Sequence, residues 1–124
     1  MNKISLEGPF RIVDYSISHS VILLRKTEII DVTPHNTDLL LGGVFYLEIP
    51  AWLEDITVEH GTQADWAYVR TRCWDEAEVI DFYSLENVFV FKSGNKKYFI
   101  GANSLTVSEN TYDPLETSIG IKRQ

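Results

Sequence analysis

The sequence has a single cysteine, Cys73, among its 124 residues. A lone cysteine cannot form a disulfide within the chain, so no disulfide framework holds the fold, and this favours a reducing compartment. The N-terminal segment lacks the long apolar stretch of a signal peptide. No window contains the roughly 18 apolar residues of a membrane span. These absences predict a cytoplasmic domain with no membrane partner.

Histidines and chemical motifs are also scarce. His19, His35 and His60 are all more than five residues apart, and there is no CxxC pair, so the spacing predicts no metal site. The chain has no Gly-x-Ser-x-Gly nucleophile motif and no phosphate loop. We therefore predict no catalytic, metal-binding or cofactor-binding residue, and a non-enzymatic role is favoured. A site built from His35, His60 and a carboxylate on distant strands stays as an alternative.

Positive charge is rare in the middle of the chain. The net charge is −7, but residues 28–91 hold thirteen acidic and only two basic residues, whereas the two ends together hold nine basic and five acidic residues. An acidic surface repels phosphate backbones, so nucleic-acid binding is disfavoured. The same surface attracts a basic partner. Its simpler interpretation is that the acidic residues keep the protein soluble.

The composition is that of an ordinary globular protein. Hydrophobic residues make up 44% of the chain, aromatic residues 12% and charged residues 23%. A chain of this length and composition predicts one domain over residues 1–124.

Runs of β-branched and aromatic residues separated by turn residues dominate the pattern. Val88–Lys92 and Lys96–Ile100 flank a Ser-Gly-Asn turn, which predicts a hairpin. Residues 31–36 are predicted to form a loop because they contain Pro34. Within 44–49, the alternation predicts that Phe45, Leu47 and Ile49 face the core. Strands are predicted over 10–17, 21–27, 39–49, 56–59, 88–92, 96–100 and 105–108.

Residues 62–78 fit two patterns. Trp66, Val69 and Cys73 have helical spacing, with Thr62 or Asp65 available to cap the start. The same segment also alternates as a strand would, and the helix is the favoured interpretation. With seven or eight strands and no strand–helix–strand repeat, the chain is predicted to be mainly β, an antiparallel sandwich or small barrel with one short helix near 62–78.

Three tryptophans lie in or beside the acidic window, outside the predicted strands. Tryptophan next to acids is typical of an interface anchor, and it equally suits a plug that closes the end of a sandwich or barrel. The candidate interface residues are Trp52, Trp66, Trp74, Glu54, Asp55, Asp75 and Glu76.

Three hypotheses about function follow. The favoured one is a non-enzymatic interaction module that binds a basic protein through its acidic face. In size and charge alone the chain resembles small acidic inhibitor and immunity proteins. The second hypothesis is a small-molecule or enzymatic site in the mouth of a barrel or sandwich, lined by His35, His60 or Tyr46. The third is a homo-oligomer formed through the strand at 39–49.

Overall fold

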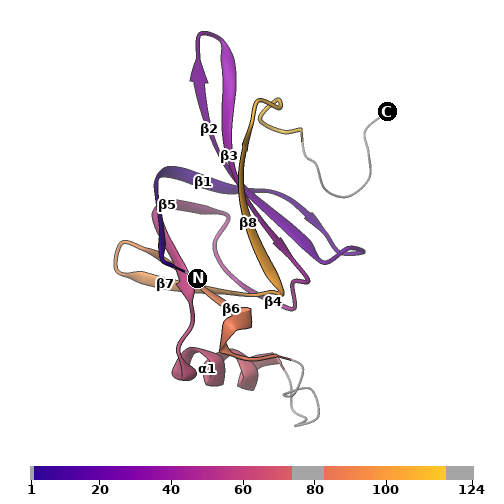
Figure 1. The fold of residues 1–124 in the computed structure, drawn as a ribbon, viewed down its shortest axis with the longest axis vertical. Coiled ribbons are helices and arrows are strands. Elements are labelled where there is room, and N and C mark those ends of the chain that lie inside the picture. Colours follow the sequence, from indigo (N-terminus) through magenta and orange to yellow (C-terminus); the bar gives the residue numbers. More distant parts are fainter. Residues whose placement is uncertain (1, 74–82, 117–124) are drawn as a thin grey trace.

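A computed structural model describes residues 2–73 and 83–116 of the protein (Figure 1). Eight strands form one antiparallel sheet in the order β4-β7-β6-β5-β1-β2-β3-β8, and the sheet does not close. This confirms the predicted mainly-β fold, and an open barrel or a sandwich describes it. The elements are β1 (Ile4–Ser16), β2 (Val21–Ile30), β3 (Thr33–Gly42), β4 (Tyr46–Glu48), β5 (Trp52–His60), α1 (Gln63–Cys73), η2 (Leu85–Asn87), β6 (Val88–Ser93), β7 (Lys96–Gly101) and β8 (Ser104–Asn110).

The long strand β1 belongs to both halves of the sheet. Its first half pairs with β5 as far as Arg11, and its second half pairs with β2 from Arg11 to Ser16. The register shifts between Leu6 and Pro9, where Gly8 has a φ of 93° that favours glycine. A bulge of this kind bends a strand. The two halves of the sheet therefore fold towards each other.

The main core lies between these halves. It takes the inward-facing apolar residues of β1, β2 and β3 on one side and those of β5, β6 and β7 on the other. Burying each of these side chains contributes roughly 1.5–3 kcal/mol. The buried members are Phe10, Ile22, Leu24, Leu39, Leu41, Val44, Leu53, Ile56, Val58, Phe89, Phe91, Ile100 and Ala102.

The helix α1 covers the outer face of β6 and β7. Its start is capped reciprocally, because the Thr62 hydroxyl accepts from the Asp65 amide at 3.2 Å and the Asp65 carboxylate accepts from the Thr62 amide at 2.8 Å. Trp66 and Val69 are buried in a second cluster, against Val90 and its neighbours on the sheet. The predicted helix over 62–78 is confirmed for the residues that the structure describes.

The strands predicted at 21–27 and 39–49 reach towards each other as far as Ile30 and Thr33, and the β2–β3 hairpin that they form projects from the body of the fold, at the end away from α1 (Figure 1). The predicted loop over 31–36 is wrong, because β3 already begins at Thr33. Pro34 lies opposite Ile29, one step from the closing pair Ile30↔Thr33. Its missing N–H would therefore point away from β2, and β8 joins β3 only from Asn36. Proline is tolerated there because the sheet needs no donor.

The β6–β7 hairpin is confirmed, with Gly94 at a φ of 61° in its turn. The prediction for 44–49 is wrong for Leu47, whereas Ile49 packs against the main core and Phe45 against the second cluster. The strand β4 has three residues and lies at the edge of the sheet, so Leu47 is 37% exposed while Val44 is buried in the core. Edge strands have neighbours on one side only, and strict alternation of buried and exposed residues fails there.

Candidate functional site

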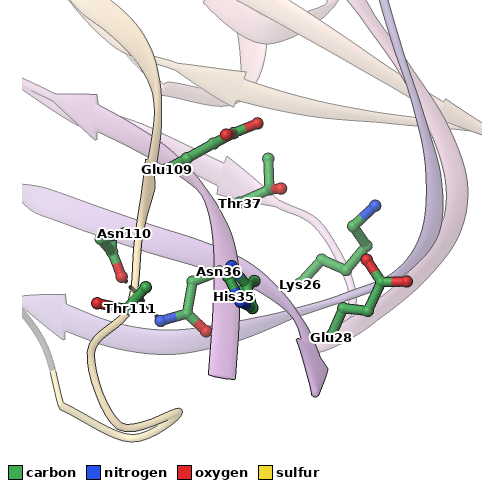
Figure 2. Close-up of a pocket in the computed structure, with 8 residues that line it drawn as sticks. All are labelled: Lys26, Glu28, His35, Asn36, Thr37, Glu109, Asn110 and Thr111. Carbon is green, nitrogen blue, oxygen red and sulfur yellow. Dashed lines mark hydrogen bonds between the residues drawn. The ribbon is translucent and has the colours of Figure 1, made fainter. Parts of the chain in front are cut away.

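The candidate site is a groove at the point where β1 leaves β2. The last pair between these strands is Arg11↔Arg25, after which β2 continues alone with β3 to Ile30. Two adjoining pockets of about 410 and about 440 Å³ lie here and share Lys26 and Glu28. Figure 2 shows the larger pocket, with His35 of β3 between the β2 and β8 side chains. We call both pockets together the acidic groove, and its titratable residues are Glu7, Lys26, Glu28, His35, Asp55 and Glu109.

Strand alternation brings these residues to one face of the sheet. Ile22 and Leu24 of β2 point into the core, so Lys26 and Glu28 continue along the same face. On β3, Leu41 and Leu39 are likewise followed on that face by Thr37 and His35. The pairing of Lys26 with Thr37, and of Thr37 with Glu109, aligns the three strands. The inner face thus changes from apolar to polar where the hairpin leaves the body.

Carboxylates outnumber cations in the groove. Among the residues that the structure describes, four carboxylates line it, against one lysine and one histidine. The ammonium of the lysine, Lys26, is directed at the backbone of β1, where it donates to the Glu7 carbonyl oxygen at 2.9 Å. Asp55 is fixed at a bend with a φ of 52°, where its carboxylate accepts from the Gly8 amide at 2.7 Å. Glu28 and Glu109 are exposed. The groove therefore has a negative field that is open to solvent.

A buried polar network on the opposite face of the same strands keeps the hairpin rigid. The Arg25 guanidinium donates to both Asp38 carboxylate oxygens at 2.7 and 3.0 Å, and both residues are buried. Its third nitrogen donates to backbone carbonyls of the segment after β8, at Asp113, Pro114 and Glu116. A bidentate, charge-assisted pair of this kind fixes geometry strongly.

Two asparagines extend this network across the three strands. Asn36, which is buried, donates to the Asn110 side chain at 2.7 Å and to the Tyr112 carbonyl at 2.9 Å. Asn110 donates in turn to Asp38 at 2.7 Å, and Thr27 donates to Asn36 at 2.6 Å. The network joins β2, β3 and β8, and its members Asn36 and Asn110 also line the larger pocket, so hydrogen bonds across three strands preorganise the groove wall.

The structure separates the predicted interface residues. Trp66 is 8% exposed and packs in the second cluster, which fits the plug alternative for this residue. Trp52 is 61% exposed, with the Arg11 guanidinium over its ring at 5.9 Å. Glu54 is exposed on β5, and Asp55 lines the acidic groove. The remaining predicted residues, Trp74, Asp75 and Glu76, lie outside the described residues.

Some acidic residues of the middle of the chain are paired with lysines in three dimensions. Asp65 pairs with Lys97 at 2.8 Å and Glu59 with Lys92 at 3.0 Å, because the basic strands β6 and β7 lie beside the acidic middle of the chain. The Lys97 hydrogen bond helps to hold the pKa of the Asp65 carboxyl below its usual value, against the opposing effect of burial. Four other described acids lie together in the groove, namely Glu7, Glu28, Asp55 and Glu109.

The carboxylate of Glu48 is engaged by two tyrosines. The hydroxyl groups of Tyr46 and Tyr68 both donate to it, the latter at 2.7 and 2.9 Å. Burial and the bond to Glu48 raise the pKa of Tyr46, and the bond to Glu48 raises the pKa of Tyr68. Arg72 stacks over the Tyr68 ring at 3.7 Å. These contacts fasten α1 to the β4 edge of the sheet.

The three histidines do not converge. His19 bonds within the β1–β2 turn, His35 lines the acidic groove, and His60 packs against Phe89 with ring centroids 5.0 Å apart. Among residues 2–73 and 83–116, no group of three or more His, Cys, Asp or Glu residues is arranged to hold a metal ion. Burial raises the pKa of the Cys73 thiol, which disfavours the reactive thiolate.

Sequence reasoning missed Glu7, Lys26, Glu28 and Glu109 as site residues. A signal was present, because the apolar alternation on 22–24 and on 39–41 turns polar at the same register in both strands. No described helix has both the length and the apolar character needed to cross a membrane. Comparisons with protein-family models, with curated proteins and with solved structures found no match to this chain.

Proposed function

We propose that this protein is a non-enzymatic interaction module that binds a basic partner protein through the acidic groove. One observation carries the proposal: four carboxylates, of Glu7, Glu28, Asp55 and Glu109, line two adjoining pockets, and Lys26, the one lysine among their described residues, donates to a backbone carbonyl. Complementary charge of this kind gives specificity and fast association. Lysine or arginine side chains of the partner would occupy the groove.

Rigidity of the groove supports a binding role. The network of Arg25, Asp38, Asn36 and Asn110 fixes the three strands that form its wall. A preorganised surface loses less conformational entropy when a partner binds. Both pockets are open to solvent and the larger is mostly polar, which suits side chains of a protein better than an enclosed small ligand.

A cationic probe tests the proposal. Fluorescent octalysine, followed by anisotropy, should bind the wild type and weaken as salt rises to about 0.15 M. The double variant Glu28→Lys/Glu109→Lys should bind octalysine about tenfold more weakly. It removes two attractions and adds two repulsions, each worth a few tenths of a kcal/mol at an exposed site.

The matched control is Glu59→Lys/Glu86→Lys, which carries the same net charge through acids that neither line the acidic groove nor belong to the candidate interface. It should bind nearly as well as the wild type. Equal losses in both double variants would mean that only net charge matters, and the groove would then not be the binding site.

A further inference from the structure

We infer that the free edge of β2 beyond Arg25 takes an extended basic segment of the partner by β-strand addition. The inference rests on the proposed function and specifies how the groove binds. It follows from the divergence of β1 from β2, which leaves residues 26–30 with a strand neighbour on the β3 side only.

The backbone groups on this edge can be identified from the register. The hairpin closes at the pair Ile30↔Thr33, so the backbone N–H and C=O groups of Ile30 bond to β3. Every second residue back along β2, Glu28 and Lys26, bonds to β3 in the same way. Thr27 and Ile29 lie between them, so their N–H and C=O groups point to the open side. Among the described residues, no backbone partner faces them. They are available for an added strand.

Residues 26–30 lack two of the usual protections of a sheet edge, a proline and a bulge. Natural edges are shielded by proline, by bulges, by extreme shortness or by charged side chains. Here the proline of the hairpin, Pro34, is on β3, and the ammonium of Lys26 is bonded to the Glu7 carbonyl. Ile29 and Ile30 are 60% and 47% exposed. An edge of five residues with exposed apolar side chains is suited to strand addition.

The acidic groove selects which strand is added. The pocket of about 410 Å³ runs along this edge, from Glu7, Gly8 and Pro9 on β1 to Lys26 and Glu28 on β2. Side chains of an added strand that lie on the groove face would meet carboxylates, whereas those on the other face would lie beside Thr27 and Ile29. Cross-strand neighbours of opposite charge are stabilising. The segment should therefore alternate basic and apolar residues.

The test uses the blocked peptide Lys-Val-Lys-Val-Lys and two N-methylated forms, one methylated on both valines and one on the second and third lysines. Successive residues of a strand direct their N–H groups to opposite sides. One methylated peptide should therefore lose about tenfold in affinity through its blocked hydrogen bonds, and the other should bind as the parent does. Equal binding of all three would overturn strand addition and leave charge attraction intact. Failure of all three, with failure of octalysine, would overturn the proposed function as well.

A protein variant gives an independent arm. Ile29→Pro removes the outward N–H and keeps the β2–β3 ladder, because the N–H of Ile29 faces away from β3. It should bind the parent peptide about tenfold more weakly than Ile29→Ala, which keeps the N–H. Hydrogen exchange on the wild type should show new protection at Thr27 and Ile29 when the peptide is present. Two results would contradict the inference. One is peptide-induced protection confined to β8, and the other is light scattering that shows the chain to be a dimer, with a second copy of the chain on this edge.

Discussion

Removing the Arg25 guanidinium should be among the most damaging single changes outside the apolar core. Arg25→Met keeps the length of the side chain but deletes both bonds to Asp38 and all three bonds to the 113–116 carbonyls. The Asp38 carboxylate, which is 3% exposed, would retain the Asn110 amide at 2.7 Å as its side-chain donor. An unpaired buried charge costs about 3–5 kcal/mol.

The measurement is urea unfolding followed by tryptophan fluorescence. With a slope of about 1.5–2 kcal/mol per molar urea, the midpoint should fall by about 2 M at an unchanged slope. The double variant Arg25→Met/Asp38→Leu should recover most of the loss, because replacing a buried ion pair by apolar residues is often nearly neutral. Lys26→Met is the control, and it should cost less than about 1 kcal/mol since its bond is at the surface.

Two results would refute this reasoning. The first is a loss of unfolding free energy below about 1 kcal/mol in Arg25→Met, which would mean that the Asp38 carboxylate is well solvated without Arg25. The second is a double variant as unstable as the single one, which would mean that packing around Arg25, rather than its charge, holds this face together.

Two further changes test local features. Val32 lies in the β2–β3 turn at a φ of 61° and is 94% exposed. Val32→Gly should therefore raise the free energy of unfolding by about 0.5–1 kcal/mol, visible as a rise of a few degrees in the melting temperature. Gly94→Val places valine at the same φ of 61° in the β6–β7 turn, and it should lower the melting temperature. Burial lowers the pKa of His60 below 6.5, so the unfolded chain takes up its proton first, and stability is lost as the pH falls from about 6.5 towards the folded-state pKa. His60→Phe, compared with His19→Phe, should reduce the difference in melting temperature between about pH 8 and pH 5, and an unchanged difference would show that His60 does not contribute to it.

Local chemistry was enough to predict some elements. The β6–β7 hairpin follows from two β-rich runs around Gly94, and the start of α1 follows from Thr62 and Asp65, which cap each other. In both cases the deciding interactions lie within a few residues along the chain. The sequence pattern alone is therefore enough to predict these two elements.

The acidic groove could not be assembled in this way. Glu7 and Asp55 meet Glu28 only because β1 bends at Gly8 and joins both halves of the sheet. The loop predicted around Pro34 failed for a related reason, since the effect of a proline depends on whether a strand lies on its N–H side. These features depend on strand order, which pairs residues that are far apart in sequence.

The hydrogen bonds that Arg25 makes to Asp38 and to the 113–116 carbonyls also impose an order of events during synthesis. Arg25 emerges from the ribosome early, but the carbonyl of Glu116 that it binds is 91 residues further along the chain. At about 5–20 residues per second, the guanidinium waits for roughly 5–20 s before this partner exists. The β2–β3 hairpin, with its open edge and exposed isoleucines, is therefore incompletely supported for that interval. Until β8 is made, the β3 side of this hairpin is open to chaperones as well as the β2 edge beyond Arg25.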